Sequence, residues 1–376
     1  HLDTHELERA RGITIFSKQA LFETEDFSVT LLDTPGHVDF SAEMERTLQV
    51  LDYAILVISA TDGVQAHTET LWRLLRRRQI PTFVFLTKMD LPNPGRAALM
   101  AQLRKHLDEG CLDFTEQNED WLEAIAMRED ALLDKYLDTG KVDPRDISGL
   151  IRLGKLFPCF FGSALHLDGV AEFLQGLAAC TEAPTYGEDF AARVFKIARD
   201  PQGNRLTYVK LTGGTLHVRA PIAYYPLHGE EIVEEKVTQL RLYSGEKFQA
   251  VSQVQAGQVC ALLGLSQTWP GQGFGTEPPA PAPLLEPVVT YRLVLPPDCD
   301  PQLLLPKLRL LEEEDPQLHL DWDAENREIH ARLMGQVQIE VLKQLIAERF
   351  QVEVAVDAGR ILYKETIAAP VEGVGH

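Results

Sequence analysis

The stretch VTLLDTPGH, residues 29–37, joins an apolar run to a turn that carries a carboxylate, a glycine and a histidine. Its apolar residues do not alternate with polar ones, which predicts that Val29–Leu32 is a strand buried on both faces of a parallel sheet. Asp33 then stands at the carboxyl end of the strand, where α/β sheets bind ligands, and can hold Mg²⁺ through water. Gly36 lets a backbone N–H approach a phosphate because no Cβ blocks it, and His37 is a candidate for orienting an attacking water. The alternative is a strand and turn without function, and the other motifs in the sequence must distinguish the two interpretations.

Further apolar runs follow this stretch, with helical patterns between them. The runs predicted to be strands are Ala54–Ser59, Thr82–Leu86 and Phe157–Phe161. Apolar residues at helical spacing predict helices over Ser41–Leu51 and Thr68–Gln79. Strands that alternate with helices are typical of a doubly wound sheet, so residues 1–186 are predicted to form one α/β domain.

Upstream of Asp33 lies ERARGITI, residues 8–15. A threonine in a mobile segment, here Thr14, can give its hydroxyl to Mg²⁺ and its backbone N–H to a γ-phosphate, and can release both after hydrolysis. The segment is therefore a candidate switch. Without its companions, the string would indicate only the start of a strand.

Two more polar strings follow predicted strands. In TKMD, residues 87–90, the Asp90 carboxylate can accept two hydrogen bonds from guanine, and the Lys88 stem can lie along the purine face. In GSAL, residues 162–165, backbone N–H groups can meet the guanine O6. Each string is weak alone, and a helix-start aspartate is the natural alternative for Asp90. Because all four strings border predicted parallel strands, we expect them to meet at one edge of the sheet.

The rest of the chain changes character after residue 186. Alternating apolar and polar residues over 187–270 predict a small β-barrel domain, and the proline-rich segment 271–287 is predicted to be a linker. Residues 288–362 show the βαββαβ order of a ferredoxin-like domain. Its predicted elements are Val288–Leu295, Gln302–Glu314, Leu318–Trp322, Glu328–Leu333, Val337–Arg349 and Val352–Val356.

Composition bounds the class of protein. Apolar residues make up 45% and charged residues 24% of the 376 residues, as in an ordinary folded domain protein, and neither a leader nor an apolar run of about 18 residues is present. We therefore expect a cytoplasmic protein with no membrane contact. The five scattered cysteines lack metal-ligand spacing and are expected to be reduced and buried. They are Cys111, Cys159, Cys180, Cys260 and Cys299.

The formal charge of −20 argues against extensive RNA binding. One local exception is a basic run that is either an RNA contact or a solvated helix face. It comprises Arg73, Arg76, Arg77 and Arg78.

The strings ERARGITI, DTPGHVDF, TKMD and GSAL resemble the switch, magnesium, guanine and base-loop motifs of translational GTPases. The resemblance implies a protein that binds GTP, GDP and Mg²⁺ and hydrolyses GTP by in-line attack of water once the ribosome, its partner, orders the switches. The implied site residues are Thr14 and Asp33 for Mg²⁺, Gly36 for the γ-phosphate, His37 for the hydrolytic water, and Thr87, Lys88, Asp90, Ser163, Ala164 and Leu165 for the nucleotide.

Two later strings point to a branch of this family. VFKI at 194–197 and MGQVQIEV at 334–341 look most like the tetracycline resistance ribosomal protection proteins, relatives of elongation factor G. The modest acidic insert at 108–140 favours the same branch. The resemblance implies a monomer that releases tetracycline from the ribosome, and residues 363–376 look like the stub of a fourth domain.

Two departures from the family pattern stand out. Thr87 replaces an asparagine, and a hydroxyl makes fewer hydrogen bonds than an amide. No GxxxxGK[ST] string occurs in these residues, so we expect them to bind nucleotide poorly as they stand. The predicted fold class is multidomain α/β: a P-loop-type GTPase domain without its P-loop, a β-barrel domain and a ferredoxin-like α+β domain. A translocase like elongation factor G, another ribosomal GTPase, and a ribosome-binding module that needs no nucleotide remain alternatives.

Overall fold

The computed structural model describes residues 8–9, 12–23, 27–117, 119–227, 229–287, 289–357 and 360–361. The chain divides into two compact units. The α/β unit comprises residues 21–31 and 48–187, and the β-rich unit comprises residues 1–20, 32–47 and 188–376. The predicted stub at 363–376 lies outside the described residues, as do Ala10 and Arg11 of the predicted switch.

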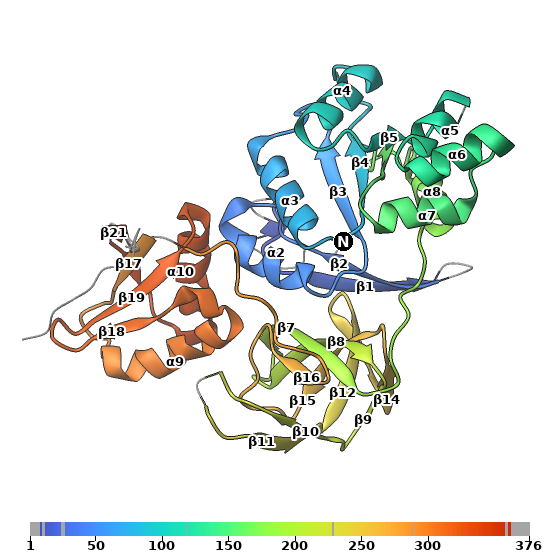
Figure 1. Ribbon diagram of the computed structural model, residues 1–376. Coiled ribbons are helices and arrows are strands. Elements are labelled where there is room, and N and C mark those ends of the chain that lie inside the picture. The colour runs from blue at the N-terminus through green and yellow to red at the C-terminus, as the bar shows by residue number, and fades with distance from the viewer. Residues whose placement is uncertain are drawn as a thin grey trace, which may run out of the picture. The chain divides into compact units, whose positions relative to one another are not determined.

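The α/β unit is built on a parallel sheet of four described strands (Figure 1). In spatial order they are β3 (Ala54–Ser59), β4 (Thr82–Thr87), β6 (Phe157–Phe161) and β5 (Cys111–Asp113). The helices of this unit are α3 (Ala66–Arg77), α4 (Arg96–His106), α5 (Glu119–Ala126), α6 (Asp130–Thr139), α7 (Pro144–Arg152) and α8 (Val170–Cys180).

Strand β4 shows why this sheet is doubly wound. Phe83 and Phe85 pack into a cluster with α5, α6, α7 and α8, whereas Val84 and Leu86 pack into a second cluster with α3 and α4. Successive side chains of a strand point to opposite faces, so a continuous apolar run requires helices on both sides. The multidomain α/β fold class predicted from the sequence is confirmed in this respect.

The strand predicted at Val29–Leu32 differs from this pattern. It lies within β2 (Ser28–Asp33), which pairs with β1 (Lys18–Glu23) in a two-stranded sheet and is not part of the parallel sheet described above. Leu31 is 39% exposed, so the prediction of a strand buried on both faces is wrong for the described chain. A short apolar run shows that a strand forms, but it does not show what the strand pairs with.

The first part of the β-rich unit is an antiparallel sheet of six strands with two strand pairs beside it. In spatial order the six are β13 (Lys247–Val251), β12 (Gln239–Ser244), β15 (Val259–Leu263), β8 (Arg205–Gly213), β7 (Ala191–Arg199) and β16 (Gly273–Gly275). The pairs are β9 (Thr215–His217) with β14 (Gln253–Gln255), and β10 (Pro221–Tyr224) with β11 (Val233–Lys236).

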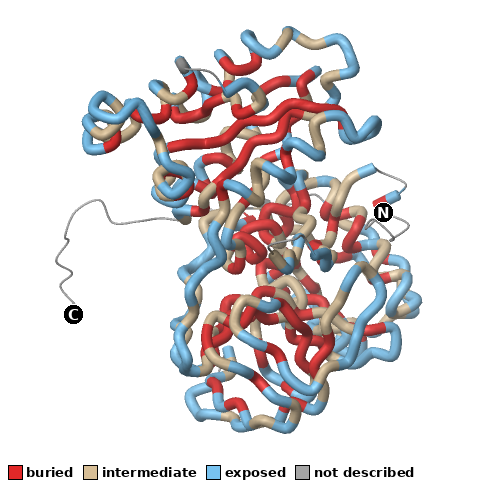
Figure 2. The backbone as a smooth tube through the Cα atoms, turned by 90° about the vertical axis from the view of Figure 1, so that its right-hand side faces the viewer, coloured by how far each residue is buried: buried red, intermediate tan, exposed pale blue. Residues whose placement is uncertain are grey.

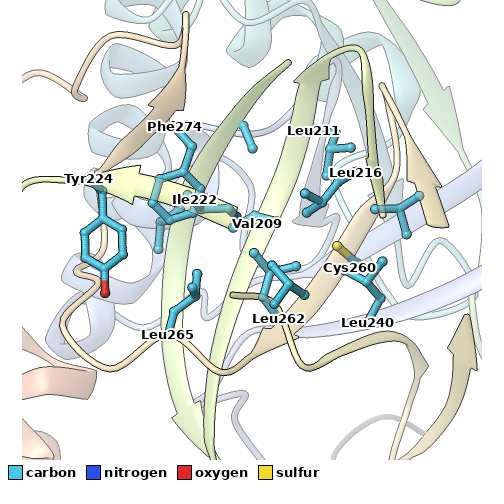
Figure 3. Packing of buried hydrophobic residues seen from close by; sticks show 14 of the residues in the cluster. Val209, Leu211, Leu216, Ile222, Tyr224, Leu240, Cys260, Leu262, Leu265 and Phe274 are labelled. Carbon is cyan, nitrogen blue, oxygen red and sulfur yellow. The ribbon is translucent and has the colours of Figure 1, made fainter. Parts of the chain in front are cut away.

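These strands enclose one apolar core. Val209, Leu211, Leu240, Cys260 and Leu262 are fully buried in it, and Figure 3 shows these side chains gathered between the strands. Val209 and Leu211 of β8 lie two residues apart and both enter this core, as the alternating pattern of that strand predicts.

Strand β16 lies inside the segment predicted to be a linker and pairs with β7. Farther along that segment, the backbone N–H of Leu284 donates to the Glu45 carboxylate at 2.8 Å. Proline-rich composition excludes a central strand, but it does not exclude an edge strand or fixed extended chain. At least part of residues 271–287 is thus bound to the fold.

The last described part of the chain has the predicted βαββαβ order. Its strands lie in the order β18 (Asp321–Asp323), β19 (Glu328–Leu333), β17 (Val289–Val294) and β20 (Ala355–Val356), and β21 (Arg360–Ile361) also pairs with β17. Helices α9 (Pro301–Glu314) and α10 (Gln336–Phe350) and the 3₁₀ turn η2 (Pro316–Leu318) complete it. The second strand begins at Asp321 rather than Leu318 because η2 occupies its predicted start.

Two short helices follow β2 in the β-rich unit. They are η1 (Val38–Phe40) and α2 (Ser41–Leu48), so the helix predicted at Ser41–Leu51 ends three residues early. Figure 2 marks the buried parts of the chain in red. Phe40, Ala42 and Met44 are buried. The first buried side chain of this pair, Asp39, is polar.

Candidate functional site

The chain at the ends of β4 and β6 is joined by three hydrogen bonds, each donated by a backbone N–H group. Gly162 donates to the Leu86 carbonyl at 2.9 Å, and Met89 donates to the Gly162 carbonyl at 3.1 Å. The Ala164 N–H donates to the Thr87 hydroxyl at 3.3 Å. The structure therefore brings the predicted base-reading strings TKMD and GSAL together at the carboxyl ends of two paired parallel strands.

Asp90 and Ser163 lie side by side in this pair of loops. The Ser163 hydroxyl beside it is the main cause that lowers the pKa of the exposed Asp90 carboxyl, so Asp90 is an acceptor at neutral pH. Ser163 is only 2% exposed, so its hydroxyl faces the Asp90 carboxylate from a buried position.

The loop that carries Ser163 is closed tightly. Ser163 and Asp168 exchange backbone hydrogen bonds of 2.9 and 3.1 Å. A Cβ on Gly162 would lie 2.0 Å from the Asp168 carbonyl oxygen, so only glycine fits there. The Leu165 side chain is 84% exposed, which leaves its backbone as the part available for the predicted nucleotide contact. Lys88 is also exposed and has a left-handed backbone with φ of 62°.

A third loop at the same edge was missed in the sequence. It follows β3, which is in parallel register with β4, and the Ala60 N–H donates to the Thr87 carbonyl at 2.9 Å. The pKa of Asp62 in this loop is lowered, first by the Ser59 hydroxyl and further by the positive charge of Lys88. The polar string that follows the apolar run Ala54–Ser59 was the available signal.

The predicted switch threonine lies in a segment folded around Glu8. One carboxylate oxygen of this fully buried residue accepts from the backbone N–H groups of Ile15 and Phe16, both at 3.1 Å. Burial would raise the pKa of Glu8, but hydrogen bonds from Lys18 and from these two N–H groups lower it overall. Thr14 is half-buried between Ile13 and Ile15. Glu8 therefore fixes the backbone on the carboxyl side of Thr14.

His37 begins the 3₁₀ turn η1, and Asp33 is the last residue of β2. The imidazole Nδ1 accepts a hydrogen bond from the Asp39 N–H at 3.2 Å, and the ring is half-exposed. Gly36 has open space around its Cα, as close approach to a ligand requires. In neutral His37 the ring proton must then be on Nε2, because an accepting Nδ1 carries none.

Helix α2 is fastened at Glu43. Its carboxylate accepts from the Ser17 N–H at 3.1 Å and lies 3.2 Å from the Lys196 ammonium and 3.0 Å from the Arg46 guanidinium. Burial would raise the pKa of Glu43, but the charges of Lys196 and Arg46 lower it to about 2. Arg46 also donates to Asp315 at 2.8 Å, so α2 is held by charges from β7 and from the chain after α9.

The predicted site residues thus fall into two groups, each defined within its own unit. The base-reading group Thr87, Lys88, Asp90, Ser163, Ala164 and Leu165 is in the α/β unit, and Thr14, Asp33, Gly36 and His37 are in the β-rich unit. That both groups surround one nucleotide stays a prediction. In the described ranges, no three Asp, Glu, His or Cys side chains cluster as a metal site. Mg²⁺ commonly takes one or two protein oxygens plus phosphate and water, so a Thr14 and Asp33 pair fits its chemistry.

At least one arginine of the basic run at α3 makes contacts within the fold. Arg76 donates to the Gly154 carbonyl at 2.7 Å and lies over the Phe157 ring, 4.9 Å from its centre. The RNA contact of the basic run stays a prediction.

Four cysteines are buried and Cys299 is half-buried, contrary to the expectation for that residue. No helix in the described parts of the chain has the length and apolar character that crossing a membrane requires.

Comparison with known sequence families finds two matches. Residues 1–183 match the family described as elongation factor Tu GTP binding domain. Residues 189–273 match elongation factor G domain 2.

Three similar proteins show how far the likeness extends. The chain is 33% identical to the oxytetracycline resistance protein of Streptomyces rimosus, over 95% of this chain and 59% of that protein. It is 33% identical to the tetracycline resistance protein TetM of Streptomyces lividans, over 97% and 61%. It is 28% identical to elongation factor G of Mycoplasma pneumoniae, over 99% and 64%.

The chain therefore spans about three fifths of the length of these relatives. A solved crystal structure of a protein from Thermus thermophilus has a similar fold. Its TM-score is 0.82 at 24% identity, over 95% of this chain and 61% of the other.

Proposed function

We propose, because the chain belongs to the translational GTPase family, that the whole protein hydrolyses GTP and that the ribosome stimulates this reaction. The observation that carries this proposal is the pairing of the loops after β4 and β6, which sets the ionised Asp90 beside the buried Ser163 hydroxyl. These loops are continuous with strands of the domain that the family match covers.

The base is read by Asp90. Guanine presents two donors, N1–H and the C2 amino group, and one carboxylate can accept from both. Adenine has no donor at N1, so its binding would leave the carboxylate unpaired. The Leu165 N–H supplies a donor for the guanine O6. The Ser163 N–H and the Ala164 N–H shape this loop by donating to Asp168 and to Thr87, and the Lys88 stem covers the ring.

The phosphates are served by residues of the β-rich unit. We assign the Thr14 hydroxyl and the Asp33 carboxylate to Mg²⁺, which when bound neutralises charge on the phosphate oxygens. Gly36 admits a backbone N–H to the γ-phosphate. His37 presents its Nε2–H side to the attacking water, while its Nδ1 is held by the Asp39 N–H. Catalysis is then a matter of positioning and charge, without a covalent intermediate.

The proposals that concern the ribosome and tetracycline are based on the similar proteins. Two of the similar proteins are named for resistance to oxytetracycline or tetracycline. We propose that the whole protein acts in the cytoplasm as a monomer that docks on ribosomes and releases tetracycline. A translocase role is the second candidate, because the likeness to elongation factor G covers 99% of the chain. Residues 1–376 contain no GxxxxGK[ST] string, so we propose that these residues alone bind nucleotide weakly.

The test uses the full-length protein, purified and assayed for GTP hydrolysis with and without ribosomes. We expect ribosomes to raise the rate of GTP hydrolysis. We expect His37→Ala to lower the ribosome-stimulated rate by at least about 100-fold and to leave GTP binding unchanged. Equal rates for His37→Ala and the unsubstituted protein would overturn the role of His37. Expression in a sensitive bacterium then separates the two candidates, because only the resistance protein raises tetracycline tolerance.

A further inference from the structure

Asp39 joins the turn after His37 to the amino end of helix α10. One carboxylate oxygen, Oδ2, accepts from the backbone N–H of Val337 at 2.7 Å and from that of Gln338 at 3.2 Å. Asp39 is only 6% exposed. A carboxylate on the first free N–H groups of a helix is favourable because it satisfies them and complements the helix dipole. The contact is therefore a strong and specific link between two segments nearly 300 residues apart.

Asp39 also contacts the imidazole ring of His37. Its backbone N–H donates to Nδ1 at 3.2 Å, and its second carboxylate oxygen, Oδ1, lies 3.6 Å from Nδ1. The next residue, Phe40, is buried with Ile15 and with Val341 of α10. The turn η1 is thus fixed by a polar and an apolar contact to one helix, and the ring orientation of His37 depends on that turn.

Gly335 makes room for this arrangement. A Cβ on Gly335 would lie 2.3 Å from Asp39 Oδ1 and 2.6 Å from Oδ2. Its backbone is extended, with φ of −172°, a conformation that any residue adopts. A side chain at position 335 would therefore displace the Asp39 carboxylate, although the backbone conformation itself accepts any residue.

We propose that Asp39 is a positioning residue that couples the orientation of His37 to helix α10 of the ferredoxin-like domain. The inference rests on the proposed function in so far as His37 orients the water. Asp39 touches no reacting atom itself. Movement of α10 changes the support of the turn that holds Nδ1, so the third domain controls whether the Nε2–H side of His37 is correctly aimed.

The test compares variants of the full-length protein on ribosomes. Asp39→Ala removes the link, Asp39→Asn keeps one acceptor oxygen, and Gly335→Ala displaces the carboxylate without altering Asp39. We expect Asp39→Ala and Gly335→Ala each to lower ribosome-stimulated hydrolysis by about 10- to 100-fold, because a small misplacement of a catalytic group is that costly. The hydrolysis rate of Asp39→Asn should lie between the rates of these variants and that of the unsubstituted protein.

A double substitution shows whether Gly335 acts through Asp39. If it does, Gly335→Ala changes the rate by less than about two-fold in the Asp39→Ala background. The matched control is Asp300→Ala, which removes the carboxylate that accepts from Gln302 N–H at the start of α9. That control loses a helix cap in the same domain but should keep the hydrolysis rate, since it has no link to His37.

A second readout is independent of hydrolysis. The ¹⁵N shifts of the His37 ring should show one neutral tautomer, protonated on Nε2, in the unsubstituted protein, and a mixture in Asp39→Ala and Gly335→Ala. If His37→Ala lowers hydrolysis and these two variants do not, the coupling is wrong and the proposed function stands. If His37→Ala has no effect, the proposed role of His37 in hydrolysis fails, and the ring shifts alone decide the coupling: identical shifts in all three proteins overturn it.

Discussion

The backbone N–H of Ala164 donates to the Thr87 hydroxyl at 3.3 Å, and this bond ties together the two loops proposed to read guanine. Thr87 stands where an asparagine is usual in the family that the sequence resembles. The hydroxyl thus still joins the loops, although with fewer hydrogen bonds than an amide can make.

Thr87→Ala should weaken guanine nucleotide binding by about five-fold, because one hydrogen bond of about 1 kcal/mol, donated by the Ala164 N–H, is lost between the two loops. Thr87→Ser keeps the hydroxyl and should bind as the unsubstituted protein does. The measurement is the Kd of fluorescent GDP for the full-length protein. Equal weakening by both substitutions would show that the methyl group, and not the hydroxyl, matters.

Gly162→Ala should disrupt the loop that carries Ser163. Its Cβ would lie 2.0 Å from the Asp168 carbonyl oxygen and 3.0 Å from the Phe85 ring, so the backbone has to move. We expect a loss of about 2 kcal/mol in the free energy of unfolding and at least about ten-fold weaker GDP binding. Gly149→Ala is the control, because a Cβ there meets nothing within 4 Å. Unchanged binding by Gly162→Ala would remove this loop from the base site.

Glu43→Gln should destabilise the β-rich unit and change its response to acid. The pKa of Glu43 is lowered to about 2 in the folded protein, so its stabilising contribution is complete well above the ordinary value of 4.5 and is lost as the pH falls toward 2. At pH 7 we expect the variant to lose about 3 kcal/mol of unfolding free energy, and the difference should narrow by about 1 kcal/mol between pH 5 and pH 3.5.

Urea unfolding at several pH values measures this effect. The control is Glu69→Gln, which removes a carboxylate that is 40% exposed and paired with His106 at the surface, where about 0.5 kcal/mol or less is expected. If Glu43→Gln were no more destabilising than this control at pH 7, the buried charge cluster would not hold α2.

The strands of the α/β unit could largely be predicted because continuous apolar runs have few other uses. Thr82–Leu86 is a central strand with a helix-covered cluster on each face, as its pattern indicates. Val29–Leu32 has the same kind of pattern but pairs with β1 in the described chain. Local pattern specifies an extended backbone, whereas the pairing partner depends on segments far away in the sequence.

The base-reading loops were predictable for a related reason. Polar strings that follow parallel strands reach the same edge of a sheet, which is why TKMD and GSAL could be placed together before the fold was known. The coupling through Asp39 could not be predicted, since its acceptor role needs Val337 and Gln338, which no sequence spacing relates to it. The string ERARGITI likewise does not show that Glu8 accepts hydrogen bonds from Ile15 and Phe16, because that contact forms only when the segment folds back on itself.

The most direct test of the account is the nucleotide preference of Asp90→Asn in the full-length protein. Xanthine has a carbonyl where guanine has the C2 amino group, so an amide pairs with xanthine, whereas a carboxylate pairs with guanine. We measure kcat/KM for ribosome-stimulated hydrolysis of GTP and XTP. The unsubstituted protein should prefer GTP by at least about 100-fold, and Asp90→Asn should reverse that preference. If Asp90→Asn still hydrolyses GTP with an unchanged kcat/KM, Asp90 does not read the base and the proposed guanine site is wrong.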